Sequence, residues 1–269
     1  MEIALKIKSV CHSYNQGKKK ILNNVNLNIA TGQFVSIVGP SGCGKSTLLR
    51  GVLGTHLPTS GEIFADDELI VRPSRHVGIV YQHYSLYDFM TAARNVAFGL
   101  TQDQTNILYR WFGYFNGWRE LRKQHLAQAE EMLDQVGLHA AIQLYPAEMS
   151  GGMKQRVAIA QALIMQPKIL LLDEPFGALD EATREELQDM LVNLYNVNKQ
   201  AKLEGKTPPY TILLVTHELN EAIYLSDRVI GLSQFHEDGA NGATVVYDRP
   251  AVAFNRSSER DYGLFVEQK

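Results

Sequence analysis

Apolar and polar residues recur along the chain with two different periods. Residues 3–7 and 25–29 alternate between apolar and polar side chains, which predicts two half-buried strands. Residues 34–38 and 168–172 are short, mostly apolar runs, which predict buried strands. Further strands are predicted at residues 77–81, 210–216, 228–232 and 243–247, together with a hairpin over 62–71 that turns at Asp66 and Asp67.

Helical patterns lie between several of these strands. They predict helices at residues 45–53, 119–136, 181–203, and from Ser150 to a point before Pro167. Gly54 and Gly137 stand where the first two would end, as expected of helix C-caps. Strands that alternate with helices predict an α/β fold with a largely parallel sheet. We expect one domain over residues 1–269, with a helical lobe inserted at residues 91–165.

The segment between the strand at 34–38 and the helix at 45–53 has the sequence of a phosphate-binding loop. Its motif G-x-x-x-x-G-K-[ST] is matched in full by Gly39, Pro40, Ser41, Gly42, Cys43, Gly44, Lys45 and Ser46, and Thr47 follows. Glycines let several backbone N–H groups face one anion, and the dipole of the following helix favours negative charge there. Lys45 is expected to reach the β- and γ-phosphates of a nucleotide, and the hydroxyl of Ser46 to ligate Mg²⁺. The alternative is a glycine-rich turn with an exposed lysine.

Cys43 lies inside this loop, beside backbone N–H groups, Lys45 and the start of a helix. These neighbours favour a thiolate, so we expect Cys43 to react with a maleimide faster than Cys11. The alternative is a side chain that points away from the nucleotide into the core.

Two carboxylates follow the apolar run at 168–172. Asp173 and Glu174 would stand at the carboxyl end of a buried strand, which is where ligands bind in open α/β sheets. Asp173 is suited to hold Mg²⁺ through water, and Glu174 to polarise an attacking water. A strand that merely ends in a polar loop is the alternative.

A second candidate anion site opens the helix after Ser150. Ser150 is a suitable N-cap residue, and Gly151 and Gly152 leave bare backbone N–H groups at the helix start. Residues 149–156 of this helix start resemble the LSGGQ signature of the ATP-binding subunits of ABC transporters, with Met149 in place of Leu and Met153 in place of Gln. Both departures spare the Ser-Gly-Gly core.

Other marks of that family occur in the same order along residues 3–248. Gln82 matches the Q-loop, residues 178–180 match the D-loop, and His217 matches the switch histidine. Tyr14 stands where the family places an aromatic ring that stacks on adenine. The resemblance implies a P-loop NTPase core with an N-terminal antiparallel β subdomain and an inserted helical lobe. It also implies that Ser46, Gln82 and Asp173 hold Mg²⁺. The residues implied to act in hydrolysis are Glu174, His217, Gln82 and Lys45.

The same resemblance implies partners. Two ATPase subunits, expected to be a homodimer, would face head to tail, so that Ser150, Gly151 and Gly152 of one subunit touch the γ-phosphate of ATP held by the other. Hydrolysis would open the dimer and drive a separate membrane permease. A periplasmic or lipid-anchored solute-binding protein is a further expected partner. Residues 216–229 resemble the nitrate/sulfonate/taurine importer group in particular.

Composition agrees with this interpretation. The formal charge of −3 lacks the basic excess typical of nucleic-acid-binding proteins. The apolar runs are too short to span a membrane, and residues 1–8 alternate in charge and polarity without the apolar core of a signal peptide. Two cysteines in 269 residues indicate a reducing compartment. We therefore expect a cytoplasmic protein, held at the inner face of the cell membrane by its permease.

Three alternatives to an importer ATPase are an exporter subunit, an ABC ATPase outside transport, and a nucleotide-binding module without activity. Residues 91–148 are too few for the coiled coil of DNA-repair relatives, and translation factors carry two such domains per chain. Intact Lys45, Asp173, Glu174 and His217 argue against an inactive module. Six aromatic residues lie between 109 and 118, and two roles remain for them. They either contact the permease or lipid, or pack within an enlarged lobe.

Overall fold

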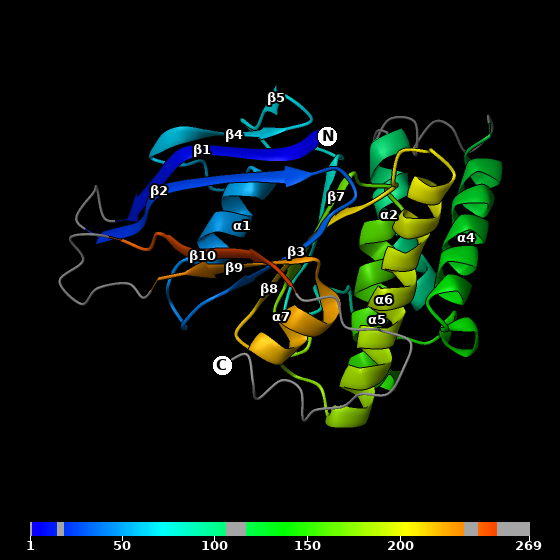
Figure 1. Ribbon diagram of the computed structural model, residues 1–269. Helices are drawn as coiled ribbons and strands as arrows, with labels where there is room; N and C mark the ends of the chain where they lie inside the picture. The colour runs from blue at the N-terminus through cyan, green and yellow to red at the C-terminus, as the bar shows by residue number, and fades with distance from the viewer. Residues whose placement is uncertain (1, 15–18, 106–116, 234–241, 252–269) are drawn as a thin grey trace.

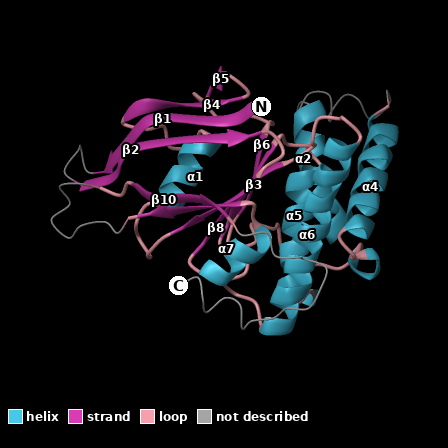
Figure 2. Cartoon of the chain, viewed as in Figure 1, coloured by secondary structure: helices cyan, strands magenta, loops and turns pink. Residues whose placement is uncertain are grey.

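The computed structural model describes residues 2–14, 19–105, 117–233 and 242–251. Two β-sheets enclose one helix, and further helices pack on the far face of the second sheet (Figures 1 and 2). The strands are β1 (Ile3–Tyr14), β2 (Lys19–Ala30), β3 (Phe34–Val38), β4 (Ser60–Ala65), β5 (Glu68–Leu69), β6 (Val77–Val80), β7 (Ile169–Asp173), β8 (Thr211–Thr216), β9 (Arg228–Leu232) and β10 (Val245–Pro250). The helices are α1 (Lys45–Leu53), α2 (Ala92–Gln104), α4 (Trp118–Gln135), α5 (Gly151–Leu163), α6 (Glu181–Leu203) and α7 (Leu219–Leu225), with short 3-10 turns at His139–Ala141 and Pro146–Glu148.

The first sheet is antiparallel, with strand order β2-β1-β4-β5. Strands β1 and β2 confirm the alternation in the sequence, because Leu5, Ile7, Val25, Leu27 and Ile29 are buried on one face. Each of these two strands has twelve residues, more than the five-residue pattern predicted. The antiparallel β subdomain implied by the family resemblance is thus present at the N-terminus.

The second sheet has the order β10-β9-β3-β8-β7-β6. Every neighbouring pair from β9 to β6 is parallel, and only β10 runs antiparallel, at one edge. The prediction of a largely parallel α/β sheet is confirmed. Parallel pairing brings the carboxyl ends of β3, β7 and β8 to the same edge, where the loops that carry the candidate site begin.

The parallel sheet is buried on both faces, which explains its uninterrupted apolar strands. In β7, Ile169 and Leu171 face a core that contains α1 and the antiparallel sheet. Leu170 and Leu172 face the opposite core, which α5 and α6 cover. Helix α1 therefore lies between the two sheets, with its first turn at the sheet edge (Figure 1).

Helices α2, α4 and α5 share a separate apolar core, and α5 also contributes to the core beneath the parallel sheet. Between α2 and α4, His125 is 2% exposed, with its Nε2 3.0 Å from Oε1 of Gln104 and its Nδ1 3.4 Å from Oγ1 of Thr101. The lobe boundaries at 91–165 stay a prediction. Residues 106–116 of the aromatic segment lie outside the described residues, and Trp118 begins α4.

Two helices differ from the sequence prediction. Helix α7 was not predicted, and α2 was anticipated only as part of a helical stretch. Strand β10 begins at Val245, because Ala243 instead forms an isolated bridge with Leu22 of the other sheet. Within the described ranges, no helix combines the length and the apolar character needed to cross a bilayer.

Candidate functional site

The phosphate-binding loop joins β3 to α1. Gly44 caps α1 with φ of 105°, a left-handed conformation that side chains rarely adopt. A Cβ atom at this position would also lie 2.8 Å from side-chain carbons of Ile21 and Leu22. Both facts require glycine here. The loop thus turns tightly under the antiparallel sheet and leaves the first backbone N–H groups of α1 at the sheet edge, an arrangement that suits an anion.

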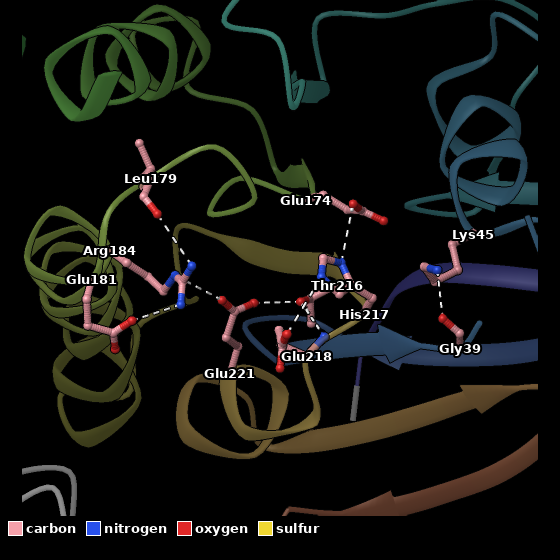
Figure 3. A network of polar contacts seen from close by, with 10 residues as sticks. All are labelled: Gly39, Lys45, Glu174, Leu179, Glu181, Arg184, Thr216, His217, Glu218 and Glu221. Atoms are coloured by element: carbon pink, nitrogen blue, oxygen red, sulfur yellow. Dashed lines mark hydrogen bonds and ion pairs between the residues drawn. The ribbon is translucent and has the colours of Figure 1, made fainter. Parts of the chain in front are cut away.

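Lys45 turns back across the loop that precedes it. Its side chain is buried, with the residue 4% exposed, and its Nζ donates to the carbonyl oxygens of Gly39 at 2.8 Å and Pro40 at 3.1 Å. Figure 3 shows the contact with Gly39. The loop carbonyls therefore hold the ammonium group close to the backbone that would receive a phosphate.

Cys43 points into the core rather than toward the loop opening. It is 1% exposed, and its Sγ lies 2.8 Å from the place where a Cβ on Gly39 would stand. Burial raises the pKa of the thiol, and the nearby charge of Lys45 only partly offsets this. The expectation of a reactive thiolate at Cys43 is therefore wrong, because desolvation outweighs the positive neighbours.

The carboxyl end of β7 meets the start of α1. The hydroxyl of Ser46 donates a hydrogen bond of 3.0 Å to Oδ1 of Asp173. Burial raises the pKa of Asp173, the Ser46 hydrogen bond lowers it, and the charge of Glu174 raises it further. A cation would reverse that effect by stabilising the ionised carboxylate.

These two oxygen ligands fit Mg²⁺, which is commonly bound through one or two carboxylates, with waters and substrate phosphates completing its shell. The described residues hold no group of three or more His, Cys, Asp or Glu side chains placed for a metal, and Mg²⁺ does not require one. Among the described residues, no hydrogen bond joins Gln82 to Ser46 or Asp173. Gln82 lies beside Gly177, with its Nε2 3.2 Å from where a Cβ of that glycine would stand.

Glu174 and His217 form a pair at the ends of neighbouring strands. Strands β7 and β8 pair in parallel, with Asp173 opposite Val215, so the residues that follow them leave the sheet together. Oε2 of Glu174 lies 3.4 Å from Nδ1 of His217, and the two side chains are 23% and 49% exposed (Figure 3).

The backbone of Glu174 is unusual. Its φ is 48°, a left-handed value that is uncommon outside glycine, asparagine and aspartate. Its N–H donates to the carbonyl of Val215 at 2.9 Å, which holds the strained turn in place. This turn begins the loop after β7, in which the Glu174 carboxylate lies 3.4 Å from Nδ1 of His217.

The signature segment forms the N-terminus of α5. Ser150 is the N-cap, and its Oγ accepts a hydrogen bond of 3.2 Å from the N–H of Met153. A Cβ on Gly152 would lie 2.0 Å from Cγ2 of Thr183 in α6, so close packing alone explains that glycine. A Cβ on Gly151 would lie 3.0 Å from the hydroxyl of Tyr84. Tyr84 was not identified from the sequence, since nothing in its local pattern marks it.

Tyr14 ends β1 and is half-buried. Its ring meets the ring of His12 edge-on, with centroids 4.8 Å apart. Residues 15–18, which follow it, lie outside the described residues. The structure thus brings together Lys45 with the loop, Ser46 with Asp173, and Glu174 with His217, while Ser150, Gly151 and Gly152 form a separate helix terminus.

Residues 22–177, more than half of the chain, match the family model described as ABC transporter. The nitrate import ATP-binding protein NrtD of Synechocystis sp. is 42% identical over 218 residues, which are 81% of this chain and 73% of that protein. The aliphatic sulfonates import ATP-binding protein SsuB of Bacillus thuringiensis is 38% identical, over 87% of this chain and 82% of that protein. The sulfate/thiosulfate import ATP-binding protein CysA of Brucella melitensis is 41% identical, and the chain spans 60% of its length.

A solved structure gives the same result. A dimeric ATP-binding cassette in a post-hydrolysis state, bound to ADP and Pi, is 33% identical, with a TM-score of 0.70 over 93% of this chain and 100% of that chain. Sequence and fold agree, and the chain belongs to the ABC transporter family.

Proposed function

We propose that this chain is the ATP-binding and hydrolysing subunit of an ABC importer. One observation carries the proposal: the sheet edge that holds Lys45 and the Ser46–Asp173 contact also holds the Glu174–His217 pair. The groups proposed as phosphate-binding loop, cation ligands and general base therefore share one edge. Phosphoryl transfer from ATP to water requires these three groups.

The proposed roles follow from the chemistry of each group. Lys45 and the backbone N–H groups of the loop bind the β- and γ-phosphates. Glu174 orients a water molecule and accepts its proton, and His217 fixes the Glu174 carboxylate through Nδ1. Ser46 and Asp173, with Gln82, would hold Mg²⁺, which supplies charge neutralisation during phosphoryl transfer.

The second anion site is assigned to a second copy of the chain. Ser150 and Gly151 stand at a different helix terminus from the phosphate loop, and the post-hydrolysis relative is dimeric. We propose that these residues of one subunit bind the γ-phosphate of ATP in the other. Tyr14 is proposed to stack on the adenine.

Membrane permease subunits and a periplasmic or lipid-anchored solute-binding protein are the proposed partners, and the cytoplasmic face of the membrane the proposed location. The relatives import nitrate, aliphatic sulfonates, or sulfate and thiosulfate. We propose a small oxyanion of this kind as the solute.

Two measurements test the proposal. The purified chain should release phosphate from Mg-ATP, and Lys45→Ala should abolish that release; equal rates in both proteins would refute the ATPase site. Cells lacking the gene should lose uptake of one labelled solute among nitrate, an alkanesulfonate and sulfate. Unchanged uptake of all three would refute the solute class while leaving the ATPase assignment intact.

A further inference from the structure

A buried hydroxyl on the residue before His217 bonds the backbone of the residue after it. Thr216 is 2% exposed and ends β8 immediately before the histidine. Its Oγ1 accepts a hydrogen bond of 3.0 Å from the N–H of Glu218 and donates one of 2.6 Å to Oε2 of Glu221. The position of His217 therefore depends on what holds Glu221.

Glu221 lies in α7 and is 8% exposed, which is unusual for a carboxylate. Burial raises its pKa, and the Thr216 hydrogen bond and the charge of Arg184 act in the opposite direction. Oε1 of Glu221 lies 3.8 Å from Nε of Arg184. A buried carboxylate needs such partners to remain ionised.

Arg184 connects this carboxylate to the start of α6. Its Nη1 donates to Oε2 of Glu181 at 3.0 Å, and its Nη2 donates to the carbonyl of Leu179 at 3.4 Å. Its Nε is buried and has no hydrogen-bond partner among the described residues, so the ion pair with Glu221 is what compensates it. Figure 3 shows the continuous series of contacts from Leu179 to Thr216.

These groups also line a cavity that reaches the candidate catalytic pair. The cavity has a volume of about 50 Å³, enough for water, and the rest of its lining is Glu174, Phe176, Gly177, His217 and Glu218. Arg184 and Glu221 thus line the same cavity as the imidazole of His217. A shift of either side chain would change the shape of the cavity that His217 and Glu174 share.

We propose that Thr216, Glu221 and Arg184 are positioning residues that fix His217 against Glu174 and tie it to residues 179–181. The proposal rests on the role given to His217 in the proposed function. None of the three touches the reacting atoms. The Arg184 side chain is 32% exposed, and ion pairs of partly exposed groups add little net stability, so we assign the pair a role in geometry.

The first test compares two substitutions at Thr216. Thr216→Val keeps the shape and removes the hydroxyl, whereas Thr216→Ser keeps the hydroxyl. Thr216→Val should lower kcat for ATP hydrolysis on the order of 10-fold or more, because small misplacement of a catalytic group is costly, and should leave KM for ATP within about 2-fold. Thr216→Ser should recover most of the rate.

The second test uses Glu221→Gln, which retains an oxygen to accept from Thr216 but loses the charge. It should also lower kcat without raising KM, and its effect should not add to that of Arg184→Gln in the double variant. The control is Asp248→Asn, which breaks an ion pair with Arg228 between β9 and β10, far from the site. It should leave kcat unchanged even where it lowers the melting temperature.

The outcomes separate this proposal from the one on which it rests. If His217→Ala abolishes hydrolysis while Thr216→Val and Glu221→Gln keep full kcat, the positioning role is refuted and the ATPase assignment stands. If His217→Ala hydrolyses ATP at the wild-type rate, the role of His217 itself fails. If Thr216→Val does not fold, the positioning role is tested by Glu221→Gln alone and by the double-mutant cycle of Glu221→Gln with Arg184→Gln.

Discussion

The hydroxyl of Ser46 lies 3.0 Å from Oδ1 of Asp173, although 127 residues separate them in sequence. The contact joins the first turn of α1 to the last residue of β7. Two motifs that are independent in the sequence therefore converge on one point. Because Glu174 follows Asp173 directly, the same junction sets the distance from a bound phosphate to the candidate base, and the first prediction concerns that base.

Glu174→Gln should keep ATP binding and lose hydrolysis. Lys45 and the Ser46–Asp173 contact remain, whereas the amide cannot accept a proton, so the rate should fall by about 10² to 10⁴. Gel filtration with Mg-ATP should show an ATP-bound dimer. Glu62→Gln, an exposed change of the same chemistry in β4, is the control and should hydrolyse ATP normally. Undiminished turnover in Glu174→Gln, with only monomer on the column, would contradict the assignment.

Gly151→Asp should block hydrolysis while nucleotide binding by the isolated chain survives. The new carboxylate would face the γ-phosphate bound by the second subunit and repel it. A Cβ atom alone approaches the Tyr84 hydroxyl at 3.0 Å, so Gly151→Ala measures the steric part of the effect, and Tyr84→Phe in the same chain should relieve it. Isothermal titration with ATP measures nucleotide binding, and a phosphate-release assay measures hydrolysis. Loss of ATP affinity in the isolated Gly151→Asp chain would place the signature in its own subunit's nucleotide site.

Cys11 should react with a maleimide faster than Cys43. Cys43 is 1% exposed, and burial raises its pKa, while Cys11 is only partly buried. Access favours Cys11, and the raised pKa of Cys43 lowers the reactive thiolate fraction at that residue. Peptide mapping after brief labelling measures the ratio, with Cys43→Ala as the reference that should label at Cys11 alone. Predominant labelling of Cys43 would show that the loop opens far more than its packing indicates.

Lowering the pH from about 7.5 to 5.5 should destabilise the wild type more than a His125→Leu variant. Burial lowers the pKa of His125 below 6.5, so the unfolded chain takes up a proton that the folded chain refuses. The stability from this residue is therefore complete above pH 6.5 and is lost as the pH falls below it. Urea unfolding at both pH values measures the difference. An equal change in the free energy of unfolding in both proteins would exclude His125 as a source of the pH dependence.

Periodicity predicted most strands because it reflects which face is buried. Alternate residues of β7 face α1 and α5, and Ile169 and Leu170 are both apolar for that reason. Helix α7 escaped prediction because seven residues are too few to establish a helical period. The phosphate loop and the carboxylates after β7 could be predicted from the sequence because their chemistry requires particular residue types at fixed spacing.

The contacts of Glu221 and Arg184 behind the candidate site could not be predicted from the sequence. Glutamate is normally exposed, so nothing in the sequence around Glu221 indicates burial, and its partner Arg184 lies 37 positions earlier in the chain (221 − 184). Cys43 shows the same limit: the motif leaves its residue type free, and only the packing against Gly39 decides where its sulfur points. Side-chain direction in a loop is a property of the tertiary fold.

The fold-back of Lys45 also explains why this position calls for lysine in particular. An ammonium group has three N–H donors, and the carbonyls of Gly39 and Pro40 accept two of them. The remaining donor then has a fixed direction, since three bonds diverge tetrahedrally from one nitrogen. An incoming oxygen meets one aimed N–H rather than a freely rotating charge. Arginine would preserve the charge, but its flat fork of donors cannot form this tripod.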